Sequence, residues 1–289
     1  MGKSKETYLN ATGNVRFNMT NDYLFRYVLQ SNEKVLRGLI CSLLHLDPKE
    51  IKSTVIKNPI KLDEEITAKE FVLDIEICLN NDTYINLEMQ VVNKHNWTDR
   101  SLSYLCRTFD QLQQGQEYNE TLPVIHVGFL DYTLFPDSPE FYATYKMMNI
   151  KNYRVYNDKF ILSVVDLTQI ELATEEDNKS GLAYWAKIFK AKTWEEIKML
   201  VHNDEYLKEA AESIYVANED EIVRQKCRAR EEAERFERTM LRDIQRLQQT
   251  VTEKDNIIAA KDNIIAVKDD IITQQEEIIR KLKEEYQTR

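Results

Sequence analysis

Four polar side chains in the segment FVLDIEICLNNDTYINLEMQVV (71–92) have the types and spacing to do chemistry together. Apolar and polar residues alternate here with the period of a β-strand, so Asp74, Glu76, Glu88 and Gln90 share the face opposite the apolar row. Facing carboxylates repel each other, and a divalent cation is one reason to keep them, because hard oxygen ligands suit Mg²⁺. The alternative is an acidic sheet face that is simply solvated.

The turn between the two alternating runs decides which polar side chains meet. The tripeptide Asn-Asn-Asp at 80–82 suits a three-residue hairpin loop, because both residue types tolerate the left-handed backbone conformation. The polar side chains of the two strands face each other only in certain pairing registers, and these registers differ from one another by two residues. One register places Asp74 opposite Glu88, and the next places Glu76 opposite Glu88 and Asp74 opposite Gln90.

The segments around this hairpin alternate between helical and strand patterns. Apolar residues at helical spacing predict helices at about 21–30, at 32–45 and from 99 to about 115. Extended patterns predict strands at 123–130, 141–149 and 159–167, and a weak strand within 52–62. This order predicts an α/β fold, with a mixed sheet flanked by helices.

The composition bounds the classes of function. The chain has 289 residues with 43% hydrophobic content, which indicates a globular protein with ample core. A formal net charge of −10 argues against broad, non-specific binding to phosphate backbones. The four cysteines form no CxxC pair, which argues against a zinc site. A polar N-terminus without a secretory signal, and no apolar run of membrane-spanning length, predict a cytoplasmic protein with no membrane partner.

Two acidic or basic side chains outside the hairpin have competing interpretations. Asp22 falls in the first turn of the first predicted helix, where it either favours the helix dipole or belongs to an active site. His126 lies in a predicted buried strand, where a lone histidine is more often a packed core residue than a ligand.

The C-terminal part of the chain has a different pattern. Residues 182–289 contain neither glycine nor proline, which predicts helix with short breaks. The heptads KDNIIAA, KDNIIAV, KDDIITQ and QEEIIRK repeat an isoleucine pair, first at 257/258, and such a period predicts a left-handed coiled coil. Either Ile257 or Ile258 can take position a, and both choices leave a poor position d. We favour self-association over a solvated helix, because an apolar stripe needs a partner.

Several stretches together resemble one family. They are FNMTNDYLFRYVL (17–29), VLDIEI (72–77), INLEMQVV (85–92), RSLSYLCRTFDQLQQGQEY (100–118) and LPVIHVGFL (122–130). The pattern is similar to the recombination-promoting nuclease and transposase family of the PD-(D/E)XK nuclease superfamily. The resemblance covers about residues 15–200.

The resemblance implies a DNA endonuclease that depends on Mg²⁺, with Mn²⁺ as a substitute, linked to recombination or mobile-element activity. Asp74 and Glu88 match the family's metal-binding carboxylates, and the Met89 main-chain carbonyl is the expected third ligand. Gln90 stands where the superfamily usually has lysine, so it can hydrogen-bond the attacking water but supplies no charge. Asp22 matches the acidic residue of the family's first helix. The predicted catalytic residues are therefore Asp22, Asp74, Glu88 and Gln90.

On this interpretation, the helix after the hairpin faces DNA. Arg100 and Tyr104 are candidates for phosphate contact, whereas we favour an ordinary exposed position for Arg107. The expected organisation is a flexible lead (1–18), a PD-(D/E)XK nuclease-like domain (19–203) and a helical region with a coiled-coil tail that forms a homo-oligomer (204–289). The competing hypothesis is a catalytically weak or inactive nuclease-fold protein that assembles through its coiled coil.

Overall fold

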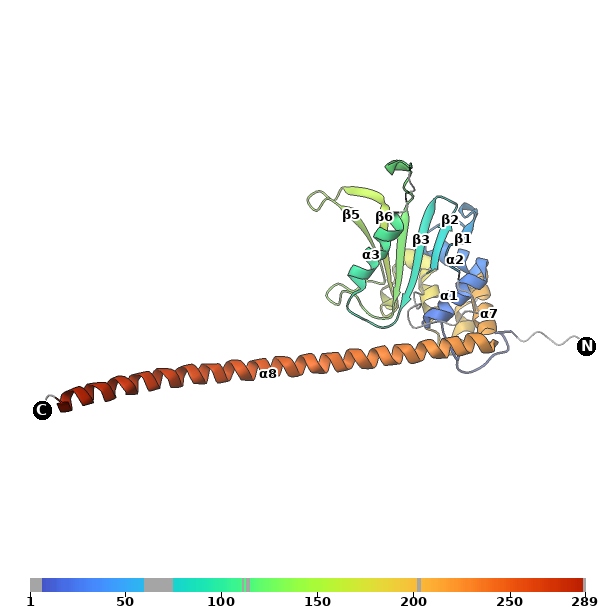
Figure 1. The fold of residues 1–289 in the computed structure, drawn as a ribbon. Coiled ribbons are helices and arrows are strands. Elements are labelled where there is room, and N and C mark those ends of the chain that lie inside the picture. Colours follow the sequence, from blue (N-terminus) through green and yellow to red (C-terminus); the bar gives the residue numbers. More distant parts are fainter. Residues whose placement is uncertain (1–6, 60–74, 111, 113–114, 202–203, 288–289) are drawn as a thin grey trace, which may run out of the picture. The chain divides into compact units, whose positions relative to one another are not determined.

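The computed structural model describes residues 7–59, 75–110, 112, 115–201 and 204–287 (Figure 1). The chain forms two compact units, Met1–Glu234 and Arg235–Arg289. The predicted division into segments 1–18, 19–203 and 204–289 stays a prediction. Among the described residues, no helix is both long enough and apolar enough to cross a membrane.

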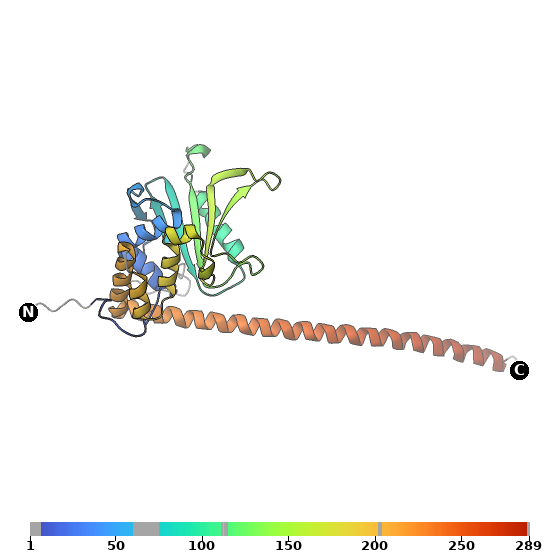
Figure 2. The ribbon, with the colours of Figure 1, turned by 180° about the vertical axis from the view of Figure 1, so that it is seen from behind.

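The first unit is built on a mixed sheet, whose described strands follow the order β1-β2-β3-β4-β6-β5 (Figures 1 and 2). The β3–β4 and β4–β6 pairs are parallel, and the other pairs are antiparallel. The strands are β1 (Thr54–Ile56), β2 (Ile75–Leu79), β3 (Thr83–Gln90), β4 (Val124–Leu130), β5 (Tyr142–Met148) and β6 (Val155–Asp166). The predicted α/β class is thus confirmed, and each predicted strand overlaps an observed one, although β6 begins at Val155 rather than at the predicted residue 159.

The β2–β3 hairpin has the predicted three-residue loop. Both asparagines of the loop at 80–82 have positive φ, 52° and 60°, as a left-handed turn requires. In the observed register Glu76 lies opposite Asn86. The alternative register, which placed Glu76 opposite Glu88, is therefore wrong. Asp74 lies outside the described residues.

Helices α1 (Asp22–Ser31) and α2 (Glu33–Leu44) pack on the apolar face of the sheet. Their starts are fixed by asparagine caps. The Asn21 side chain accepts a hydrogen bond from the backbone N–H of Leu24, and the Asn32 side chain accepts two from the first turn of α2. Both helices match the predicted ranges. The sheet residues buried beneath them include Ile75, Ile77, Ile85, Leu87, Met89, Val127 and Phe129.

Helix α3 (Trp97–Phe109) packs on β4 and β6 over the opposite face of the sheet. It ends earlier than the predicted position near residue 115. The backbone N–H of Asp110 still donates to the carbonyl of Cys106, but Asp110 itself has φ −85° and ψ 61°, which does not continue a helix. The predicted helix end near residue 115 is therefore wrong, because the chain leaves the helical conformation at Asp110.

The C-terminal helices tie the start of the chain into the first unit. Asn218 Oδ1 accepts from the backbone N–H of Phe17 at 2.9 Å, and Asn218 Nδ2 donates to the Phe17 carbonyl at 3.0 Å. Asn21 Nδ2 donates to the carbonyl of Cys227 at 3.0 Å. The helices are α4 (Glu175–Lys179), α5 (Leu182–Lys190), α6 (Trp194–Leu200), α7 (Glu205–Glu219) and α8 (Glu221–Gln287), and short 3₁₀ turns lie at Pro48–Glu50, Tyr118–Glu120 and Ile170–Leu172.

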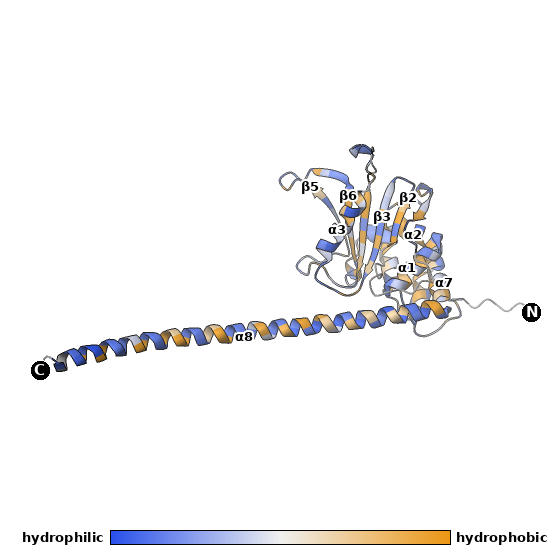
Figure 3. Ribbon diagram, viewed as in Figure 1, coloured by the Kyte–Doolittle hydropathy of each residue, from blue (hydrophilic) through white to orange (hydrophobic). Residues whose placement is uncertain are grey.

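The helical nature predicted for the C-terminal region is confirmed over its described residues. Helix α8 runs without a break from Glu221 to Gln287, and hydrophobic residues recur along it between charged ones (Figure 3). The coiled coil stays a prediction.

Candidate functional site

The polar side chains of β3 are buried rather than solvated. Asn86, Glu88 and Gln90 are 2%, 5% and 9% exposed, on the side of the sheet that α3 covers. The alternative of a solvated acidic face is therefore wrong for these three residues. A buried carboxylate is costly unless it is paired, so the partners of Glu88 define the site.

Arg100 of α3 pairs with Glu88, which brings together two of the predicted site residues. Arg100 Nε and Nη2 each lie 2.9 Å from Glu88 Oε1. The arginine side chain is 30% exposed, whereas that of Glu88 is 7% exposed. A guanidinium in this position holds a buried carboxylate and also reaches solvent, where it can meet an incoming anion.

His126 of β4 faces the same site from the neighbouring strand. Asn86 lies opposite it, and Asn86 Nδ2 donates to His126 Nδ1 at 2.9 Å, which leaves the proton of the neutral ring on Nε2. Burial, and then the charge of Arg100, lower the pKa of His126 to about 4. The ring is therefore neutral at pH 7, and its Nε2, 3.8 Å from Glu88 Oε2, makes no ion pair there. The histidine is fully buried, as expected of a core residue, yet it is part of the site.

Aromatic rings of α3 lie against His126. The Tyr104 and His126 rings are stacked, with centroids 6.2 Å apart and planes at 8°, and the Trp97 ring lies 5.6 Å from His126. The guanidinium carbons of Arg100 and Arg107 lie 5.0 and 5.6 Å from the centre of the Tyr104 ring. Tyr104 therefore contacts two arginines by cation–π interactions at the rim of the site.

Gly128 sets how closely α3 approaches the sheet. It lies opposite Glu88 in the β3–β4 register, and a Cβ atom at this position would lie 2.0 Å from Cζ2 of Trp97. The indole ring occupies the space that any larger residue would need, and a strand glycine often marks such an approach. Trp97 thereby fixes the distance from which Arg100 reaches Glu88.

Several buried polar atoms on this face have no hydrogen-bond partner among the described residues. They are Asn86 Oδ1, Gln90 Oε1, Trp97 Nε1, His126 Nε2 and Tyr132 Oη. Orphaned buried polar atoms are costly, so their gathering on one face indicates a site for water, a cation or an anionic ligand. Burial, and then the charge of Glu88, raise the pKa of the Tyr132 hydroxyl, which keeps this group a proton donor at neutral pH.

The other predicted hairpin residues lie on both faces of the sheet. Gln90 shares the face of Glu88, and its Nε2 donates to the Val92 carbonyl at 3.2 Å. Met89 packs in the apolar core on the opposite face, so only its main chain is available to the site. Asp74 lies outside the described residues.

Asp22 is held by a different arginine. Its carboxylate oxygens lie 2.7 and 2.6 Å from Nε of Arg230 in the first turns of α8, and both side chains are largely buried. Arg230 Nε also lies 3.5 Å from Glu234. The structure thus gives Asp22 and Glu88 separate arginine partners, and the predicted catalytic role of Asp22 stays a prediction.

The sequence interpretation missed three residues of the site, namely Asn86, Gly128 and Trp97, and it assigned His126 to the core. The sequence contained signals for two of these residues. Asn86 has the same parity as Glu88 within the hairpin, and a glycine inside an apolar strand indicates close packing. The pairing that brings β4 beside β3 is not visible in either segment alone.

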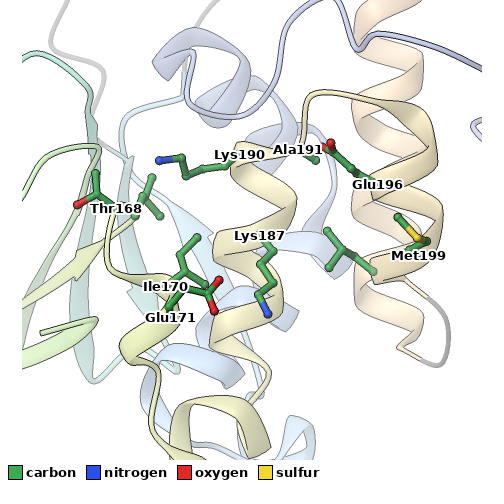
Figure 4. Close-up of a pocket in the computed structure, with 10 residues that line it drawn as sticks. Thr168, Ile170, Glu171, Lys187, Lys190, Ala191, Glu196 and Met199 are labelled. Atoms are coloured by element: carbon green, nitrogen blue, oxygen red, sulfur yellow. The ribbon is translucent and has the colours of Figure 1, made fainter.

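A separate pocket of about 450 Å³ lies between the end of β6, α5 and α6 (Figure 4). Lys187, Lys190, Glu171 and Glu196 stand around it. Lys190 Nζ is paired with Asp131 at 2.7 Å. No described residue of the Glu88 site lines this pocket, so it adds nothing to the chemistry above.

Comparison with known proteins identifies the family of the chain. A family model described as PD-(D/E)XK nuclease family transposase matches residues 19–243, which is most of the chain. The matched range includes α1, the whole sheet, α3 and the first turns of α8. Comparison with curated proteins and with solved structures gave no match. The family match confirms the resemblance seen in the sequence: the chain belongs to the PD-(D/E)XK nuclease family transposases.

Proposed function

We propose that this protein is a Mg²⁺-dependent DNA endonuclease that hydrolyses phosphodiester bonds in recombination or mobile-element activity. Family membership supports the nuclease or transposase-like role. The observation that carries the proposal is Glu88, a buried carboxylate on the strand where the family places its E-x-K motif, held by an arginine that reaches solvent. The cytoplasmic location stays a prediction.

The donor atoms around Glu88 fit a hard divalent cation. Gln90 Oε1 and Asn86 Oδ1 are buried oxygens that accept no hydrogen bond within the described part of the chain, and Mg²⁺ and Mn²⁺ prefer oxygen ligands. Within the described ranges, no three acidic, histidine or cysteine side chains could hold a metal ion. The proposed ligands are Glu88, the Met89 carbonyl and, from the sequence alone, Asp74, whereas the Gln90 and Asn86 amide oxygens would accept hydrogen bonds from water at the cation. Bound Mg²⁺ would supply positive charge for the phosphate and acidity for the attacking water.

The remaining site residues bind and orient the substrate. Arg100 donates to the phosphate, and the Tyr104 ring holds the guanidinium by a cation–π contact. The neutral ring of His126 packs against the indole of Trp97 and lies beside the Glu88 carboxylate, so the two rings bound the site on this side. Gln90 orients the attacking water through its amide. These local cations and donors offset the acidic net charge of the chain, −10, where DNA would bind.

Plasmid cleavage tests the proposal directly. We expect the full chain to nick or linearise supercoiled plasmid with Mg²⁺ or Mn²⁺, and to leave it intact with EDTA. Calorimetry should show Mn²⁺ binding in the absence of DNA, a readout that does not depend on turnover. A protein that neither binds Mn²⁺ nor cuts DNA under any of these conditions would overturn the proposal.

The second candidate is an interaction protein that has lost strong nuclease activity and assembles through α8. Two observations favour it. Gln90 replaces the usual lysine of the superfamily, and the second unit exposes a long row of isoleucines. Metal binding distinguishes the two candidates, because an adapter needs no tight Mg²⁺ or Mn²⁺ site.

Gln90→Ala is expected to lower the cleavage rate by about 10-fold, which corresponds to the loss of one neutral hydrogen bond of ~1.4 kcal/mol. Cation affinity should stay largely intact, because the carboxylates carry it. Gln90→Lys should keep at least the parental rate, since lysine restores the usual charge at this position. The measurements are single-turnover cleavage and Mn²⁺ calorimetry, with Gln169→Ala as a control outside the site. Loss of cation binding in Gln90→Ala would show that the assigned role is wrong.

A further inference from the structure

The second unit carries an apolar seam along α8. β-Branched residues stand at every seventh position from 244 to 279, and each is 46–57% exposed. They are Ile244, Val251, Ile258, Ile265, Ile272 and Ile279. A seven-residue apolar period of this length is typical of position a in a left-handed coiled coil.

The residues before the isoleucine repeat select one of the two possible registers. Met240 and Leu247 fall at position d when the six seam residues take position a, which gives complete apolar layers. The other register, with Ile257 at a, would place Asp243 and Thr250 at a. Exposed Met240 and Leu247 therefore favour the register with Ile258 at a.

In this register the flanking positions carry a regular pattern of charge and apolarity. Position g is isoleucine in four heptads: Ile257, Ile264, Ile271 and Ile278. Position d is lysine in three heptads, and position e is the aspartate that follows each lysine. These residues are Lys254, Asp255, Lys261, Asp262, Lys268 and Asp269.

The direction of the partner helix decides what each of these side chains meets. Around a helix, g lies beside d, and e lies beside a. In a parallel pair, d packs against e of the partner and a packs against g of the partner, so lysine meets aspartate and isoleucine meets isoleucine. In an antiparallel pair, d packs against g and a packs against e, so lysine meets isoleucine and isoleucine meets aspartate. The parallel arrangement thus matches polarity on both flanks, and its aspartates at e also offset the lysines at d, which in this arrangement face their own copies.

We propose that α8 forms a parallel, in-register coiled coil with a second copy of this chain. The lysines at 254, 261 and 268 pair with the aspartates at 255, 262 and 269 of that copy. β-Branched residues at a favour two strands, and the interchain lysine–aspartate pairs fix the direction and register. This inference goes beyond the proposed nuclease function and does not depend on it.

Site-specific disulfides test the arrangement in the full chain. Cys106 is the exposed cysteine of the described residues and is first replaced by serine, while the other three are buried. In a parallel pair each a residue faces its own copy, so Val251→Cys and Ile279→Cys should each give a covalent dimer on mild oxidation. Asn263→Cys, at the outward position f, should not.

Sedimentation distinguishes a wrong helix direction from a lack of self-association. A dimer in which at most one of the two a-position variants cross-links would overturn the parallel register, because an antiparallel pair brings only its central residues together. A monomer at micromolar concentration would overturn self-association itself. Plasmid cleavage by the same preparation tests the nuclease proposal separately. A failure of the coiled-coil proposal can therefore be distinguished from a failure of the nuclease proposal.

A charge exchange provides a second, independent test. The triple variant Lys254→Glu, Lys261→Glu, Lys268→Glu should dimerise at least about 10-fold more weakly than the parent, because glutamate then faces aspartate. The triple variant Asp255→Lys, Asp262→Lys, Asp269→Lys should weaken likewise. Mixing the two should restore a heterodimer. Parental self-association of either triple variant would contradict the lysine–aspartate pairing.

Discussion

Glu88→Gln is expected to abolish cation-dependent DNA cleavage, with a loss of about 100-fold or more in rate. Replacing residues that merely support a metal ligand already costs 10–100-fold in affinity or activity, and a ligand itself should cost at least the upper end of that range. The neutral amide of glutamine cannot supply the negative charge that holds a divalent cation. Arg100 would also lose its charged partner. Single-turnover plasmid cleavage and Mn²⁺ calorimetry measure the two losses separately.

Glu234→Gln is the matched control. Glu234 is also a buried glutamate beside an arginine, at 3.5 Å from Arg230, so its replacement removes comparable charge elsewhere in the first unit. It should bind Mn²⁺ and cut plasmid as the parent does. If Glu88→Gln cleaved DNA at the parental rate while remaining folded, the site would have to lie elsewhere.

Arg230→Met is expected to destabilise the first unit by about 3–5 kcal/mol, the usual cost of removing one partner from a buried ion pair. The side chains of Asp22 and Glu234 are 5% and 7% exposed, and both would lose the cation beside them. Urea unfolding measures the effect. Arg246→Met is the control, because Arg246 is an exposed arginine of the same helix whose aspartate contact is 3.9 Å long; it should change stability by less than about 1 kcal/mol.

The double variant Asp22→Asn, Arg230→Met distinguishes the structural role of Asp22 from a catalytic one. Removing the buried negative charge together with its cation should recover part of the lost stability. If Asp22 serves catalysis, as its match to the family implies, the refolded double variant should still cut plasmid poorly. Parental cleavage by this variant would assign Asp22 to stability alone.

The sequence was sufficient for the features that depend on near neighbours. Period-two alternation identifies the β2–β3 hairpin because a strand places successive side chains on opposite faces. Two adjacent asparagines identify its loop, and parity reduces the possible registers to two. Asparagine caps and helical spacing likewise locate α1 and α2. Each of these signals lies within a few residues of the feature that it predicts.

The rest of the site depends on contacts between distant segments. His126 meets Asn86 from 40 positions away, through a parallel pairing that neither strand encodes by itself. The burial of Glu88 depends on α3, and α3 reaches the sheet because the indole of Trp97 fits over a glycine. Alternation can show that a face is polar, but it cannot show whether water or a helix covers that face.

The contacts that join the N-terminal segment to α7 and α8 can form only late in the synthesis of the chain. Asp22 and Arg230 are separated by 208 positions, and Phe17 and Asn218 by 201. At a synthesis rate of about 5–20 residues per second, the N-terminal segment waits roughly 10–40 s for these partners. Helices α1 and α2 and the sheet are translated before α5 and α7, which pack against α1 and α2, so the apolar surfaces of α1 and α2 stay partly uncovered during synthesis. We expect the nascent chain to expose apolar surface of the kind that chaperones bind until the first turns of α8 emerge.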